Sequence, residues 1–100
     1  MIQMIDFLKD SGIEDKVIAI LNNKYYDNIL YSINCNEYEI KRIIDYLRSI
    51  GINCIDELLI DHINLFLQPL ENIENIFNKT DINSLVSSIN NNPDIIDNII

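Results

Sequence analysis

A short sequence frame recurs three times, and it constrains the fold more than any other feature of the chain. Each copy has a large apolar residue, a turn residue four positions later and then isoleucine. Apolar residues at helical spacing follow each copy. The copies are offset by 39 and 30 residues. They describe helical hairpins that need neighbours to bury their apolar faces. The copies are Leu8, Gly12 and Ile13, then Leu47, Gly51 and Ile52, then Phe77, Asp81 and Ile82.

The spacing of apolar residues predicts helices in the first third of the chain. A helix over 1–10 ends at Gly12, because glycine suits the left-handed conformation beyond a helix end. A second helix opens with the acids Glu14 and Asp15. Residues 24–33 fit a short helix better than a strand. The residues that carry the spacing are Met1, Met4, Ile5, Leu8, Ile13, Val17, Ile20, Leu21, Tyr25, Tyr26, Ile29, Leu30 and Ile33.

The middle of the chain gives the clearest helix, over 37–49, which Asn34 or Asn36 can cap and Gly51 ends. A fourth helix follows, capped by Asn53 with Asp56 as a weak capping box. A fifth begins at 68–69 with proline at its first helical position. The expected inward residues are Ile40, Ile43, Ile44, Leu47, Ile50, Ile55, Leu58, Leu59, Ile63, Leu70, Ile73, Ile76 and Phe77.

The last part of the chain predicts a capped helix and a terminal turn. Asp81 caps a sixth helix, and the asparagines at 90–92 break it. The sequence Asn92, Pro93, Asp94 then starts a final turn or short helix. The expected apolar residues are Ile82, Leu85, Val86, Ile89, Ile95, Ile96, Ile99 and Ile100.

These elements predict a single all-α domain over 1–100, with six or seven short helices. Its hairpins form approximate repeats over 1–39, 40–69 and 70–100, stacked as a small right-handed solenoid or an irregular bundle. The 23 isoleucines and 10 leucines supply ample core. No Asn-Gly or Asp-Gly hairpin signal supports a sheet.

The net charge of −9 limits the classes of partner. It disfavours nucleic acid and an anionic membrane, since both attract clusters of lysine and arginine. The second half is the more acidic, with Lys79 its one basic residue. Many acids fall in expected first helical turns, where the helix dipole gives them a structural role. The 15 asparagines with so many isoleucines suggest an AT-rich genome.

The cysteines and the hydropathy indicate the compartment. Cys35 and Cys54 are the two cysteines, and we expect small buried apolar residues rather than a disulfide. No secretory leader and no apolar run near the ~20 residues of a membrane span occur. We therefore expect a cytoplasmic protein with reduced thiols.

The final unit combines an isoleucine frame, a helix, an Asn-Pro break at Asn92 and Pro93, and a further Ile-Ile pair. It resembles the repeat of the mitochondrial transcription termination factor family, over roughly 5–98. The resemblance implies a curved right-handed solenoid of two helices plus a short third one per repeat, and a concave face that binds nucleic acid. The basic groove of that family is missing after residue 50, so we take only the architecture from the resemblance.

No residue pattern predicts catalysis, a metal or a cofactor. His62 is the one histidine, and a histidine at a helix end satisfied by solvent or a carbonyl is favoured over an acid–base residue. Cys54 and His62 lack the second ligand pair of a zinc site. The acids Asp56, Glu57 and Asp61 lack a calcium-loop pattern. The serines at 84, 87 and 88 have no histidine nearby in sequence.

Two groups of residues are candidates for an interface with another protein. Tyr25, Tyr26 and Tyr31 form an aromatic cluster, which is alternatively half-buried between repeats. Apolar stripes also lie at both chain ends, where solenoids usually carry polar caps. The stripe at the C-terminal end, which we expect to contact a protein partner or a second copy, comprises Ile95, Ile96, Ile99 and Ile100.

The sequence therefore predicts a non-catalytic, acidic helical-repeat module that binds protein. Two alternatives stay open: a nucleic-acid-binding repeat like that of the family named above, and a small enzyme whose site cannot be assembled from sequence. A deep pocket holding His62 with two carboxylates would favour the enzyme.

Overall fold

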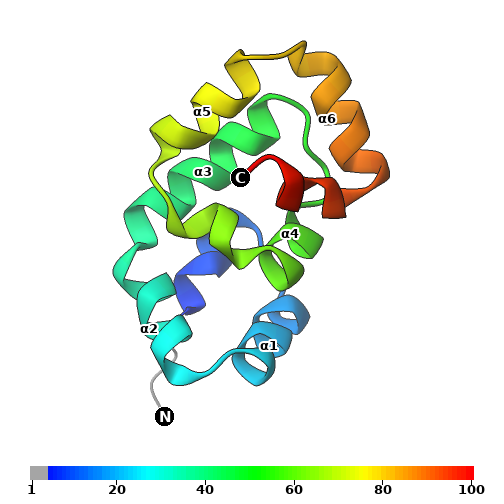
Figure 1. Cartoon of the computed structure of the whole chain (residues 1–100). Helices are drawn as coiled ribbons and strands as arrows, with labels where there is room; N and C mark the ends of the chain where they lie inside the picture. Colours follow the sequence, from blue (N-terminus) through cyan, green and yellow to red (C-terminus); the bar gives the residue numbers. More distant parts are fainter. Residues whose placement is uncertain (1–4) are drawn as a thin grey trace.

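The computed structural model describes residues 5–100, and this part of the chain is all-helical, as predicted (Figure 1). Helix α3 contacts η1, α2, α4, η2 and α5, which places it at the centre of the fold. The elements are η1 (Asp6–Ser11), α1 (Asp15–Lys24), α2 (Asp27–Cys35), α3 (Glu37–Ser49), α4 (Ile55–Asp61), η2 (Ile63–Leu67), α5 (Leu70–Asn78), α6 (Ile82–Asn91) and η3 (Pro93–Asn98), where η denotes a 3-10 helix.

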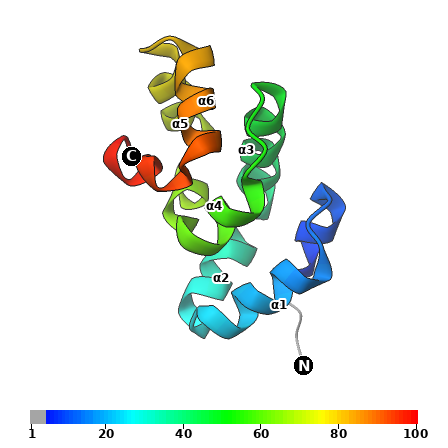
Figure 2. The same cartoon turned by 90° about the vertical axis from the view of Figure 1, so that its right-hand side faces the viewer.

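The molecule is elongated, with principal extents of 44, 24 and 23 Å. Helices α1 and α2 lie at one end, and the hairpin of α5 and α6 lies at the other (Figure 2). Side-chain hydrogen bonds between distant segments of the described chain join residues 31 to 39 positions apart. Each of these bonds therefore links two segments that lie about a third of the chain apart in sequence.

The first two sequence frames form the same turn. Gly12 and Gly51 have φ values of 82° and 102°, in the left-handed region. The amide of Ile13 donates to the carbonyl of Leu8 at 3.1 Å, and that of Ile52 donates to Leu47 at 2.9 Å. These six-residue closures satisfy carbonyls that a helix end leaves without partners.

The third frame ends differently, because Asp81 replaces the glycine. Asp81 has φ −66°, and its side chain caps α6 by accepting from the amide of Asn83 at 3.1 Å. The break that the sequence predicted after α6 is also present. The Asn92 side chain accepts a hydrogen bond from the amide of Asp94 at 3.3 Å, and Pro93 begins η3.

The variant Gly51→Ala is expected to lower the free energy of unfolding by about 1–2 kcal/mol, the cost of a left-handed Cβ-bearing residue. A Cβ there would lie 3.5 Å from Val86 Cγ1, an ordinary contact, so the loss comes from the backbone. Urea denaturation measures it. Gly51→Asn should lose less, because asparagine tolerates this conformation. An equal loss in both variants would point to steric contact instead.

One hydrophobic core runs through the described part of the chain, with side chains from η1 to η3. Leu8, Leu47 and Phe77, the first residues of the three frames, are all fully buried. The other side chains that are almost completely excluded from solvent include Ile5, Leu21, Ile33, Ile40, Ile43, Ile44, Leu58, Leu59, Phe66, Ile73 and Ile89.

Several details differ from the sequence-based prediction. Ile18 is buried and Ile20 is exposed, because α1 turns the face with Val17, Ile18 and Leu21 to the core. Ile76 is only partly buried. The expected inward residues Met1 and Met4 lie outside the described residues.

The predicted helix starts also need correction. Asn36 occupies the N-cap of α3, but its amide group donates to the carbonyl of Ser32. Cys54, not Asn53, is the N-cap of α4. The amide of Asn53 instead donates to Asn90 Oδ1 at 2.9 Å. Pro69 is the N-cap of α5 rather than its first helical residue.

Candidate binding groove

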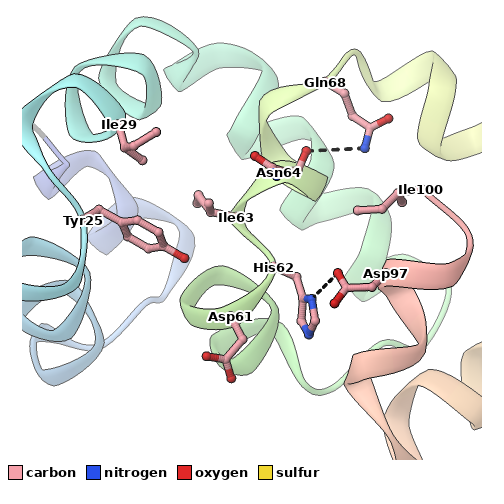
Figure 3. Close-up of a pocket in the computed structure, with 9 residues that line it drawn as sticks. All are labelled: Tyr25, Ile29, Asp61, His62, Ile63, Asn64, Gln68, Asp97 and Ile100. Atoms are coloured by element: carbon pink, nitrogen blue, oxygen red, sulfur yellow. Dashed lines mark hydrogen bonds and ion pairs between the residues drawn. The ribbon is translucent and has the colours of Figure 1, made fainter.

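A cavity of about 700 Å³ opens where the short helices α2, η2 and η3 approach one another (Figure 3). Residues from three separate segments line it. The α1–α2 region supplies one wall, the end of α4 with η2 supplies the floor, and the C-terminal segment supplies the other wall. The lining residues are Tyr25, Ile29, Asp61, His62, Ile63, Asn64, Gln68, Asp97 and Ile100.

One wall is held by contacts with the end of α4. The hydroxyl of Tyr25 donates to the carbonyl of Ile60 at 2.5 Å. The ammonium group of Lys24 donates to the same carbonyl at 2.7 Å and to Asp61 Oδ1 at 2.9 Å. The hydrogen bond to Asp61 is the main cause that raises the pKa of Lys24 above its usual value, and the same bond lowers the pKa of Asp61. A cation and a carboxylate thus join the end of α1 to the end of α4.

The other wall is held by His62, which separates α4 from η2. The residue has φ −135° and ψ 47°, a conformation that ends α4. Its side chain is only 4% exposed. The ring atom Nδ1 lies 2.8 Å from Asp97 Oδ1, and Nε2 lies 3.0 Å from Asp94 Oδ1. Both carboxylates belong to η3, so the His62 side chain links this element to the end of α4.

The two contacts favour the charged imidazole. Burial of the His62 ring opposes its charge, but the hydrogen bonds to Asp97 and Asp94 outweigh burial and raise the pKa of His62 above its usual value. A neutral imidazole has one N–H and can donate to only one of the two carboxylates. The imidazolium donates to both. With both nitrogens engaged, the ring has no free lone pair with which to accept a proton from a substrate.

The stabilisation that His62 provides is expected to depend on pH. Because the pKa is raised in the folded state, this contribution is complete below the ordinary value of about 6.5 and is lost as the pH rises through the folded-state pKa. The carboxylates of Asp94 and Asp97 contact the ring, and that of Asp61 belongs to the preceding residue. Urea denaturation at about pH 6 and about pH 8.5 measures this dependence. Between these two values, the free energy of unfolding should fall more for the natural chain than for His62→Gln. Parallel curves would contradict the prediction.

The predicted tyrosine cluster does not share one environment. Tyr25 is partly buried in the groove wall, whereas Tyr26 and Tyr31 are exposed. Tyr38, at the start of α3, is also exposed, and the sequence analysis missed it. The helical spacing gave no sign that Tyr38 is an exposed aromatic residue of interest, because it lies in the first turn of the amphipathic helix α3 and outside its apolar face.

The C-terminal isoleucines divide between the core and the surface. Ile96 is buried beneath η3 and cannot contact a partner. Ile95 and Ile99 are partly buried against the core. Ile100 is exposed and lines the groove. The part of the predicted apolar stripe that a partner can reach is therefore small.

The two thiols also differ. Cys54 is buried, its Sγ lies 3.7 Å from the carbonyl of Ile89, and burial raises its pKa. Cys35 is exposed, contrary to the expectation of two buried cysteines. Ser84 contacts Asp81 Oδ2 at 3.2 Å as part of the α6 cap.

Two wider properties apply to residues 5–100. This part of the chain holds no group of three or more histidine, cysteine or acidic side chains arranged to bind a metal ion. None of its helices has the length and apolar character needed to cross a membrane.

Comparisons with known proteins found no relative of this chain. No protein-family model matches the sequence, and neither curated proteins nor solved structures give a significant match.

Proposed function

We propose that this chain is a non-catalytic helical-repeat module that binds another protein through the groove between α2, η2 and η3. The observation that carries this proposal is the composition of the groove, whose lining comes from three successive segments of the chain. Repeat proteins commonly bind partners along a surface to which successive units contribute.

The repeat itself is part of the proposal. We divide the chain into three units of three helical elements: η1, α1 and α2, then α3, α4 and η2, then α5, α6 and η3. The short 3-10 helix comes last in the second and third units and first in the first unit. The boundaries between these units fall near residues 36 and 69. The first boundary therefore lies at Asn36, whereas the boundary predicted from the sequence, after residue 39, would fall inside α3. Pairs of elements at equivalent positions contact one another, namely η1 with α3, α3 with α5, α1 with α4 and α2 with η2. The second and third units have the order of two helices and a short third one that the family resemblance implies, whereas the first unit does not.

Two observations weigh against the alternative functions. The groove does bring His62 together with two carboxylates, the arrangement that would favour an enzyme, but both ring nitrogens contact those carboxylates, so the ring is not free to take a proton from a substrate. A nucleic-acid groove would need basic side chains. The charged residues at this groove are Lys24, His62 and the three carboxylates of Asp61, Asp94 and Asp97. A cytoplasmic location is part of our proposal, and the free thiols of Cys35 and Cys54 support it.

Selection from a random peptide library displayed on phage tests the proposal without assuming a partner. We expect the immobilised chain to enrich a sequence motif, and synthetic peptides with that motif to bind in solution. Failure to enrich any motif would contradict the proposed function. Tight, salt-sensitive binding of duplex or single-stranded DNA in a gel shift would favour the nucleic-acid alternative instead.

A further inference from the structure

The groove has an apolar floor and an acidic edge, and together they specify the chemistry of an occupant. Ile29, Ile63 and Ile100 provide the apolar surface. Of these, Ile100 is 42% exposed, so apolar area is available to a ligand. A binding site that combines apolar contact with a few polar groups takes ligands of matching mixed character.

The acidic edge retains unused hydrogen-bond acceptors. The side chains of Asp61 and Asp97 are 57% and 67% exposed, and each uses its Oδ1 atom to contact Lys24 or His62. Within residues 5–100, the Oδ2 atom of each accepts no hydrogen bond. A guanidinium or ammonium group could donate to these oxygens, and such charge-assisted bonds are about twice as strong as neutral ones.

The local charge favours a cation even when the internal ion pairs are counted. Asp61, Asp94 and Asp97 contribute three negative charges, and Lys24 with protonated His62 contributes two positive charges. The sum is −1, and it becomes −2 when His62 is neutral. The whole chain, at −9, adds a long-range field of the same sign.

From this charge complementarity we propose that the groove binds a basic peptide segment, with an apolar side chain against Ile29 and Ile100 and a lysine or arginine beside Asp61 or Asp97. This inference rests on the proposed protein-binding function and names the class of its partner. Asn64 in η2 and Gln68 directly after it line the groove and supply amide groups that can bond the peptide backbone.

Fluorescence anisotropy with two synthetic peptides tests the charge preference. In one peptide lysine and arginine alternate with leucine, and in the other glutamate replaces every basic residue. We expect the basic peptide to bind and the acidic one not to bind. Equal binding, binding of neither peptide, or preference for the acidic peptide would overturn the proposal.

Matched variants test the location. Asn64→Lys adds a positive charge in the groove, and Asn75→Lys adds the same charge at an exposed position of α5. Ile100→Ser removes apolar surface in the groove, and Ile20→Ser does so on α1, where the exposed fraction is 44% against 42%. The groove variants should each weaken binding by about three- to fivefold. The α1 and α5 variants should have little effect, and equal losses in groove and control variants would refute the site.

These results separate the two proposals. Library selection makes no assumption about charge, so an enriched motif that lacks basic residues would overturn the basic partner and leave the binding function intact. A library that yields no motif would remove the proposed function itself. Circular dichroism of all four variants confirms that they fold, as their exposed positions predict.

Discussion

Replacing Phe66 with alanine is expected to lower the free energy of unfolding by about 3–5 kcal/mol, the range for truncating a buried aromatic side chain. Phe66 lies in η2 and is fully buried. Because η2 contacts α2, α3 and α4, the cavity would open at the junction of the first two helical groups. A domain of this size has a total stability of about 5–15 kcal/mol, so the variant should lose a large share of it. Urea denaturation followed by circular dichroism measures the loss.

Phe7→Ala provides the control for that experiment. Phe7 has the same side chain, but it is only partly buried, and its ring lies 5.9 Å from the Lys41 ammonium group. Truncation there should cost clearly less than at Phe66. Equal losses would show that η2 does not occupy the centre of the core.

Removing the imidazole in His62→Ala is expected to lower the free energy of unfolding by about 2 kcal/mol, since two hydrogen bonds to charged groups and a buried ring are lost. The loss stays moderate because Asp94 and Asp97 are largely exposed and remain solvated. The effect should be local. Amide hydrogen exchange should accelerate most over Pro93–Asn98, the element that His62 holds.

His62→Gln serves as the comparison for the alanine variant. Its amide can donate to one of the two carboxylates, so it should protect η3 better than alanine does. Faster exchange spread evenly over the chain, or unchanged exchange in η3, would show that His62 does not attach this element.

Local chemistry explains why the sequence predicted so much of the fold. The turns at Gly12 and Gly51 need only a left-handed residue beyond a helix end, and neighbouring positions decide this. The cap at Asp81 and the break at Asn92 and Pro93 are decided within a few residues as well. Helical spacing then identified most buried positions, because a face that is apolar along one helix must be covered by another.

The groove could not be predicted, because long-range contacts build it. His62 meets Asp94 and Asp97 across 32 and 35 residues, and no local pattern links a histidine to acids at that distance. The sequence favoured solvent or a carbonyl as its partner, whereas the structure supplies two carboxylates. In sequence Ile95, Ile96, Ile99 and Ile100 form one apolar stripe, yet the packing of η3 buries Ile96 and leaves Ile100 at the groove.

Chemical-shift mapping tests the central claim most directly. A basic peptide that binds the isotope-labelled chain should shift the amide resonances of α2, η2 and η3 around Tyr25, His62, Asn64 and Ile100, while α5 stays unchanged. Shifts centred instead on the exposed tyrosines Tyr26, Tyr31 and Tyr38, or on the hairpin of α5 and α6, would contradict a binding groove built jointly by the three helical groups.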